Sequence, residues 1–394
     1  MMNVQLQVSG RAHALLEKRL VGQGVDAIGT PALVADLDAV NRNLQRMSEF
    51  AARRGLRLRP QANAHKSPAF ALLQMQAGAA GLCTRTVSEA EALAAHGIRD
   101  IFIANEVLNH DKLRRVAALA QYLKLPDGRM AIAVDSAEGI HRLAQAMQLT
   151  SAVIDVFIEI DIGQGGGGVP PGNAAVQLAR LLVERSPKLR YAGLHARHGG
   201  AQRLRLVHER RAAIAQAATL LQDTNRLLQE AGLPPPRITG GGAGAFAQEA
   251  ASGLWGEIQP GSYLFMDADY LAHERDPAQP QFESALYVKS QIISVSARHA
   301  VCDAGGNSLA LDRGPPRVVA LPGQPELVYE VSGSEHGILR PATEGGALPA
   351  LGDTVWLLPG HCGPTVALHG YHVVVGGGLA GGTVVAVLAI DKTP

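Results

Sequence analysis

Residues 58–68, LRPQANAHKSP, place chemically reactive side chains at the end of a short apolar strand, just before a helical stretch. The amine of Lys66 could form an imine with a carbonyl compound, and the imidazole of His65 could transfer protons. Asn63 carries an amide in the same stretch, and an amide cannot form that imine because its lone pair is delocalised into the carbonyl. The stretch therefore indicates either a reactive-lysine site or the remnant of one.

Three other histidines fall where a metal site could form. His195 and His198 end another apolar strand, and His361 lies in a loop near the C-terminus. With a carboxylate such as Asp161, they would supply the ligand types that Zn²⁺ or Mn²⁺ accepts, and the metal would polarise a substrate carbonyl or alcohol. Arg197, on the same face of an extended segment as His195, would hold a substrate carboxylate. The alternatives are a hydrogen-bonded interior histidine at 195 and a structural carboxylate, or a base, at 161.

The elements that would position these side chains alternate over the first two thirds of the chain. From residue 30 onwards, short apolar runs such as ALVADL, LRLRP and IDVFIEI are followed by stretches with apolar residues at helical spacing. Repeated strand and helix units imply parallel strands joined by right-handed crossovers. About eight such units predict an α/β fold, a (β/α)8 TIM barrel with its reactive residues at the carboxyl ends of the strands.

The pattern changes to strand, turn and strand near residue 276, without a long helix. We therefore predict an N-terminal segment in residues 1–29, a barrel domain in residues 30–275 and a mainly antiparallel β domain in residues 276–394. A cleft between the barrel mouth and the β domain would be the expected ligand site.

The composition and charge of the chain limit which kinds of molecule it is expected to bind. The formal net charge is +1 and the basic residues are spread along the chain, which disfavours nucleic acid and anionic membranes. The 3 cysteines are too few for a disulfide framework. No run approaches the ~20 apolar residues of a membrane span. We expect a cytoplasmic protein with a small-molecule substrate, no nucleic-acid partner and no membrane association.

Colinear stretches from about residue 30 to residue 372 resemble one family, the D-threonine aldolase and D-serine dehydratase group of alanine-racemase-like enzymes of fold type III. The resemblance implies a barrel with a C-terminal β domain, pyridoxal phosphate (PLP) held by a lysine, a divalent metal, and a homodimer with sites near its interface. The stretches that carry it include TPALVADLDAVNRN, RLRPQANAHKSP, VSEAEALAAHGI, YAGLHARHGGAQ, TGGGAG, IQPGSYLFMDADY, SEHGIL and LPGHCGPTVALH.

The same resemblance shows what this chain lacks. The family has its Schiff-base lysine where this chain has Asn63, and its second metal ligand where this chain has Gly363. Lys66 is also present in the family beside the proper lysine. In an extended strand, residues three positions apart lie on opposite faces, so we expect Lys66 to be a surface lysine or one near a phosphate.

Other positions of the family's site are kept. The glycines of TGGGAG follow a strand, where their N–H groups could cradle a phosphate or carboxylate unless they form only a flexible turn. These glycines include Gly240, Gly241 and Gly242. The resemblance places Tyr263 near the cofactor phosphate. It also places Glu335 and His336 near the cleft, where either could act as an acid or base.

Three functions are consistent with this sequence. The first is a PLP-independent, metal-assisted lyase that cleaves or dehydrates a β-hydroxy amino acid or a similar small hydroxylated substrate. The second is a non-catalytic protein that binds PLP or another small phosphorylated metabolite without a covalent bond. The third is residual PLP-dependent activity that uses Lys66. For the enzymatic cases the candidate catalytic residues are His65, Lys66, Asp161, His195, Arg197, Glu335 and His336, and the candidate metal ligands are His361, His195 and His198.

Overall fold

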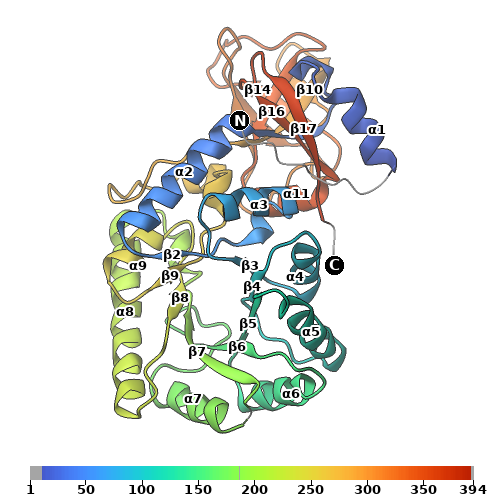
Figure 1. The fold of residues 1–394 in the computed structure, drawn as a ribbon. Helices are drawn as coiled ribbons and strands as arrows, with labels where there is room; N and C mark the ends of the chain where they lie inside the picture. The colour runs from blue at the N-terminus through green and yellow to red at the C-terminus, as the bar shows by residue number, and fades with distance from the viewer. Residues whose placement is uncertain (1–10, 186, 392–394) are drawn as a thin grey trace.

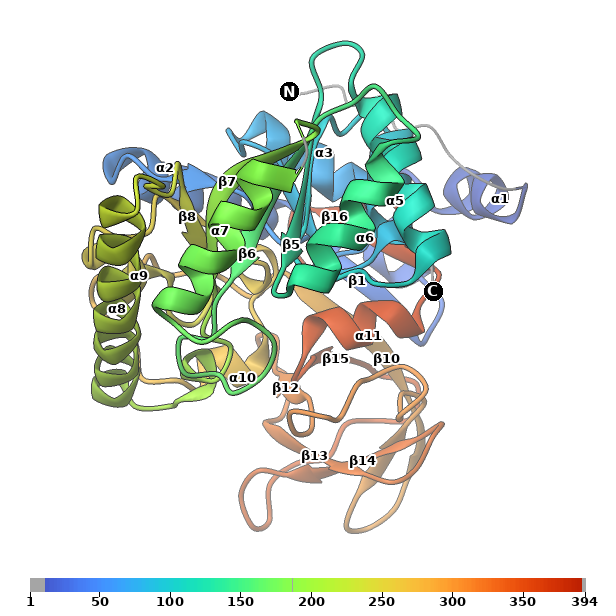
Figure 2. The ribbon, with the colours of Figure 1, turned by 90° about the horizontal axis from the view of Figure 1, so that it is seen from below.

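The computed structural model describes residues 11–185 and 187–391. The chain forms a parallel barrel and a second domain built on a mainly antiparallel sheet, which lie one above the other in Figure 1. The short helix α11 lies where the two domains meet, near the barrel segment that follows β2 (Figures 1 and 2).

The barrel has eight parallel strands in the order β2-β9-β8-β7-β6-β5-β4-β3. A parallel bridge between Gln61 and Cys83 joins the two ends of this order and closes the barrel. The predicted (β/α)8 barrel is thereby confirmed. Its strands are β2 (Arg57–Leu58), β3 (Leu82–Thr84), β4 (Asp100–Ile103), β5 (Arg129–Val134), β6 (Ile154–Glu159), β7 (Leu189–Ala196), β8 (Ile238–Gly240) and β9 (Glu257–Ile258).

Several of the barrel helices begin where a polar side chain accepts hydrogen bonds from free backbone N–H groups. Asp36 accepts hydrogen bonds from two N–H groups at the start of α2, and Thr86 and Glu89 form a capping box at the start of α4. The helices are α2 (Leu37–Arg53), α3 (Pro68–Gln76), α4 (Val87–Ala95), α5 (His110–Leu123), α6 (Ala137–Met147), α7 (Asn173–Arg185), α8 (Val207–Glu230), α9 (Phe246–Ala251) and α10 (Ala268–Leu271).

The second domain is a nine-stranded sheet that also takes one strand from the N-terminal part of the chain. Strand β1 in ALVADL, which we assigned to the barrel, instead pairs antiparallel with β10 and parallel with β16. An apolar run shows that a strand is buried but not which sheet it joins, because pairing is decided by distant parts of the chain. The strands are β1 (Ala32–Asp36), β10 (Leu286–Val295), β11 (Ala300–Cys302), β12 (Arg317–Val319), β13 (Leu327–Val331), β14 (Gly337–Pro341), β15 (Thr354–Leu358), β16 (Tyr371–Gly376) and β17 (Thr383–Ala389).

The predicted N-terminal segment packs on this second domain in its described part. Helix α1 (Arg11–Leu20) contacts β17, and residues 1–10 lie outside the described residues. Helix α11 spans Cys362–Leu368. No helix in the described ranges is both long and apolar enough to cross a membrane.

The barrel interior is filled by small and aromatic side chains above a buried ion-pair network. Phe102 and Phe157 pack with their ring centroids 4.9 Å apart among buried alanines and Cys83. Arg59, only 4% exposed, binds Glu257 at 3.0 Å and Asp100 at 2.6 Å. Glu257 and Asp100 begin their strands, so this network supports the amino ends of the barrel and leaves the carboxyl ends for a site.

Candidate functional site

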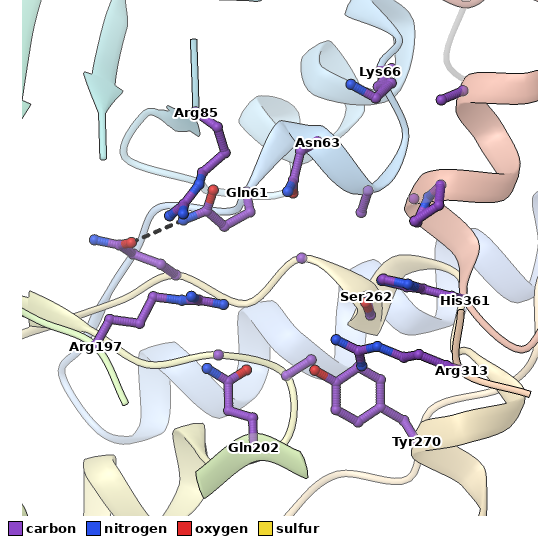
Figure 3. Close-up of a pocket in the computed structure, with 18 of the residues that line it drawn as sticks. Gln61, Asn63, Lys66, Arg85, Arg197, Gln202, Ser262, Tyr270, Arg313 and His361 are labelled. Atoms are coloured by element: carbon purple, nitrogen blue, oxygen red, sulfur yellow. Dashed lines mark hydrogen bonds between the residues drawn. The ribbon is translucent and has the colours of Figure 1, made fainter. Parts of the chain in front are cut away.

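A cavity of about 460 Å³ lies at the carboxyl ends of the barrel strands, where the second domain covers them. Arg85 directly follows β3, Arg197 follows β7, and Gln259 follows β9. His361 and Arg313 come from the second domain (Figure 3). The predicted cleft between barrel mouth and β domain is therefore present, and strand ends position its side chains.

Asn63 reaches this cavity from the 3₁₀ turn η2 (Ala62–Ala64), not from an extended strand. Its side chain is exposed, and Figure 3 shows it beside Gln61 on the cavity wall. The backbone of Gly363 packs closely here, since a Cβ added to that glycine would lie 3.2 Å from the Asn63 carbonyl oxygen. The amide thus occupies the wall where the resemblance expects the Schiff-base lysine.

Lys66 also lines the cavity, so the prediction that residues 63 and 66 lie on opposite faces is wrong. The turn replaces the extended geometry on which that prediction depended, and Lys66 itself has a left-handed φ of 47°. Its Nζ donates a hydrogen bond to Glu89 Oε1 at 3.0 Å, and Glu89 also accepts from the N–H groups of Arg85 and Thr86. The Lys66 amine is therefore held by a carboxylate and is not free to attack a carbonyl.

His65 points away from the cavity into the protein interior. It is fully buried, shares a hydrogen bond with Gln74 at 3.1 Å, and accepts one from the Ser67 N–H at 3.1 Å. Burial lowers the pKa of His65 to about 4, so the ring is neutral near pH 7. The structure therefore gives His65 a packing position outside the candidate site.

His195 is buried behind the cavity, whereas Arg197 lines it. The ring of His195 is 1% exposed, packs edge-on against Phe102, and shares a hydrogen bond with Glu159 Oε2 at 3.0 Å. The expectation that both side chains enter the barrel mouth is wrong for His195, because its ring packs deeper in the barrel interior against Phe102 and does not line the cavity.

Glu159 also lies beside a second carboxyl group. Burial and then the charge of Glu159 raise the pKa of Glu106 to about 8. Burial opposes ionisation of Glu159 itself, but His195 outweighs it and lowers the pKa of that carboxyl. One proton is therefore held on Glu106 while Glu159 stays ionised beside the ring.

The three predicted metal ligands are not brought together. Only His361 lines the cavity, where its Nδ1 lies 2.7 Å from Asp312 Oδ2. The Nδ1 of His198 instead accepts a hydrogen bond from the Ala201 N–H at 3.2 Å. Across residues 11–185 and 187–391, no group of three or more His, Cys, Asp or Glu side chains could hold a metal ion.

Asp161 stabilises the glycine-rich loop that follows β6. Its carboxylate accepts hydrogen bonds from the N–H groups of Gly163, Gln164 and Gly165 at 2.8 to 3.1 Å. Burial opposes ionisation, but these N–H groups outweigh it and lower the pKa of Asp161. Asp161 does not line the cavity, so its observed position matches a structural carboxylate.

The glycine loop after β8 contributes Gly242 to the cavity wall, while Gly240 and Gly241 lie behind it. The fully buried carboxyl group of Glu249 packs against this loop, since a Cβ added to Gly241 would lie 2.9 Å from its Oε2. Burial raises the pKa of Glu249 to about 8, against the opposing effects of Arg197 and the Gly242 N–H. An acidic side chain therefore already lies beside the expected phosphate cradle.

Three other predicted site residues lie elsewhere. Tyr263 is 1% exposed, and its hydroxyl accepts a hydrogen bond from Gln74 at 3.2 Å in the core rather than in the cavity. Glu335 and His336 are exposed in the connection between β13 and β14 and do not line the cavity of this chain.

Several residues of the cavity wall were not predicted from the sequence. Arg85, Gln202, Tyr270 and Arg313 all line the wall, and Figure 3 shows Arg313 beside the Tyr270 ring. Arg85 could have been found, since it directly follows an apolar strand of a predicted barrel. Arg313 carries no local signal, because its position depends on how the second domain sits over the barrel.

Each of the two domains matches a family of known proteins. The family described as alanine racemase, N-terminal domain, matches residues 35–269, and the putative serine dehydratase domain matches residues 285–375. The chain is 40% identical to a D-threonine aldolase of Arthrobacter sp over 370 residues, which are 94% of this chain and 95% of that protein. It is 34% identical to a 3-hydroxy-D-aspartate aldolase of Paracoccus denitrificans over 96% of each chain.

A solved structure shows the same arrangement of domains. The D-threonine aldolase from Filomicrobium marinum superposes with a TM-score of 0.88 at 40% identity, covering 94% of this chain and 97% of that one. These relatives are lyases, and the likeness extends over nearly the whole of both chains.

Proposed function

The chain belongs to the D-threonine aldolase and D-serine dehydratase family of alanine-racemase-like lyases, and from this premise we propose that it binds a small hydroxylated amino acid non-covalently. The observation that carries the proposal is the amide of Asn63 on the cavity wall, together with the Lys66–Glu89 ion pair at 3.0 Å. Neither side chain offers a free amine to a cofactor aldehyde.

The residues present do not fit the covalent cofactor of the family. PLP would supply an electron sink for bond cleavage at the amino acid's α-carbon when bound through an imine. Asn63 cannot form that bond, and the nearby amine of Lys66 is paired with Glu89. No step of the proposed function therefore passes through PLP.

The chemistry of the cavity favours a polar ligand with a carboxylate group. Among the described residues, four cationic side chains line it, against one carboxylate, that of Glu89. These cations are Lys66, Arg85, Arg197 and Arg313. Carboxamide groups supply both donors and acceptors for hydroxyl and amino groups. The relatives' names describe hydroxylated D-amino acids, D-threonine and 3-hydroxy-D-aspartate, which have these groups.

Titration calorimetry with D-threonine, 3-hydroxy-D-aspartate and PLP tests this function. We expect saturable binding of a hydroxylated D-amino acid, unchanged ligand after recovery, and no absorption band of an imine when PLP is added. Borohydride reduction that attaches a pyridoxyl group to Lys66 would instead establish the residual PLP chemistry. The proposal is contradicted if neither D-threonine nor 3-hydroxy-D-aspartate binds.

A metal-assisted lyase is the second candidate, favoured by the approach of His361 to Asp312 at 2.7 Å on the cavity side of the second domain. The two groups share a hydrogen bond at this separation, and an imidazole and a carboxylate are two of the three or more ligands that such a metal would need. Metal analysis of untreated protein tests it. One bound ion per chain that is lost in His361→Ala, with aldehyde released from D-threonine, would favour this candidate over non-covalent binding alone.

A further inference from the structure

Arg197 is a cation of the cavity without a counter-ion in contact. Among the described residues no hydrogen bond or ion pair reaches its side chain, and its Nε is buried without a partner. Two other cations of the wall are paired, since Lys66 binds Glu89 at 3.0 Å and Arg313 binds Asp269 at 3.2 Å. A half-buried guanidinium without a partner is costly unless an anion joins it.

Arg85 adds a second positive charge next to Arg197. Its guanidinium donates one hydrogen bond, to the Ala104 carbonyl at 3.2 Å, and makes no ion pair in the described part of the chain. Figure 3 shows both guanidinium groups on the same side of the cavity, opposite His361 and Arg313. Burial and then the charge of Arg85 lower the pKa of Arg197, which places the two groups within electrostatic reach.

Hydrogen-bonding groups without partners adjoin this pair. The Oε1 of Gln61 and the Nε2 of Gln202 are buried atoms without partners, and both residues line the cavity. The Gln202 side chain packs tightly against the glycine loop, since a Cβ added to Gly242 would lie 1.9 Å from its Oε1. One acceptor and one donor are thus available near two unpaired cations.

We infer that Arg85 and Arg197 form an anion clamp that binds the carboxylate of the ligand, while Gln61, Asn63 and Gln202 bind its amino and hydroxyl groups. The inference rests on the proposed function and defines its ligand class, a small carboxylate with hydrogen-bonding groups on the adjacent carbons. Guanidinium groups suit this role because their planar fork matches a carboxylate. The glycine loop is the weaker anion site, because it contributes no cationic side chain to the cavity wall.

Calorimetry with three probes tests the clamp: D-threonine, D-threoninol, in which the carboxylate is replaced by an alcohol, and inorganic phosphate. We expect Arg197→Met and Arg85→Met each to weaken D-threonine binding at least tenfold, as charged hydrogen bonds of about 1.5–3 kcal/mol imply. Arg197→Lys should recover part of the loss. D-threoninol should bind at least tenfold more weakly than D-threonine to the wild-type protein and be insensitive to both Met variants.

Arg226→Met is the matched control, since it removes one positive charge from the exposed face of α8, where Arg226 pairs with Glu230. Circular dichroism confirms folding of each variant, and Arg197→Lys keeps the test valid if a Met variant does not fold. Equal affinity of D-threonine for the wild-type protein and both Met variants would overturn the clamp and leave the proposed function intact. Binding of phosphate alone would overturn the carboxylate class. Binding of none of the probes would overturn both inferences.

Discussion

Replacing Glu249 by glutamine should make the protein more stable at alkaline pH. Glu249 is fully buried against the glycine loop, and burial raises the pKa of its carboxyl group to about 8 from 4.5. The folded state therefore keeps the proton that the unfolded chain releases near pH 4.5. Glutamine has the same shape and never ionises, so it removes this dependence on pH.

The sign and size of the effect follow from the two pKa values. Below pH 4.5 Glu249 is protonated in both states and its contribution to the free energy of unfolding is fully present. That contribution falls as the pH rises and is lost once the pH passes about 8. Since one pKa unit corresponds to about 1.4 kcal/mol, the wild-type protein should lose at most about 5 kcal/mol relative to Glu249→Gln over this range.

Urea unfolding at pH 5, 7 and 9 measures this difference. The advantage of Glu249→Gln over wild type should be small at pH 5 and largest at pH 9. Glu184→Gln on the exposed face of α7 is the control and should show the same pH dependence as the wild-type protein. A constant difference between wild type and Glu249→Gln at all three pH values would refute the buried, protonated state of this carboxyl group.

Three other changes should have distinct effects. Asn63→Lys restores an amine to the cavity wall and should produce an imine absorption band with PLP; no band would mean that the pocket has been rebuilt beyond this residue. Gly242→Ala should displace the Gln202 amide, because the new Cβ would lie 1.9 Å from its Oε1, and weaken D-threonine binding about fivefold by calorimetry. Glu257→Gln should lower the free energy of unfolding in urea by about 3 kcal/mol, because it leaves the buried Arg59 guanidinium with one fewer carboxylate; a loss below about 1 kcal/mol would contradict this role.

The barrel was predictable because its signal is local and repeated. Each strand and helix unit shows its own periodicity, and the parallel order follows from the connections. Strand β1 shows where this reasoning fails, since Ala32–Asp36 has the apolar pattern of a barrel strand but pairs with β10 and β16 of the other sheet. Which sheet a strand joins is decided by contacts far along the sequence.

The candidate site was predictable only in its position. The prediction that site residues lie at strand ends is correct for Arg197. The resemblance correctly identified Asn63 as a residue of the cavity wall. The predicted side-chain direction was wrong for Lys66, because a 3₁₀ turn replaces the extended strand. It was also wrong for His195, which points into the core. The pairing of Lys66 with Glu89 could not be read from the sequence, since the two residues are 23 positions apart.

The most direct test of non-covalent binding is intact-mass measurement after the protein has been incubated with PLP and D-threonine and reduced with borohydride. The structure predicts the mass of the unmodified chain, because Asn63 cannot form an imine and Lys66 is held by Glu89. Native mass spectrometry of the same mixture without reduction should show bound D-threonine that is lost on denaturation. A stoichiometric pyridoxyl adduct mapped to Lys66 would contradict non-covalent binding and restore the family's Schiff-base chemistry at a displaced lysine.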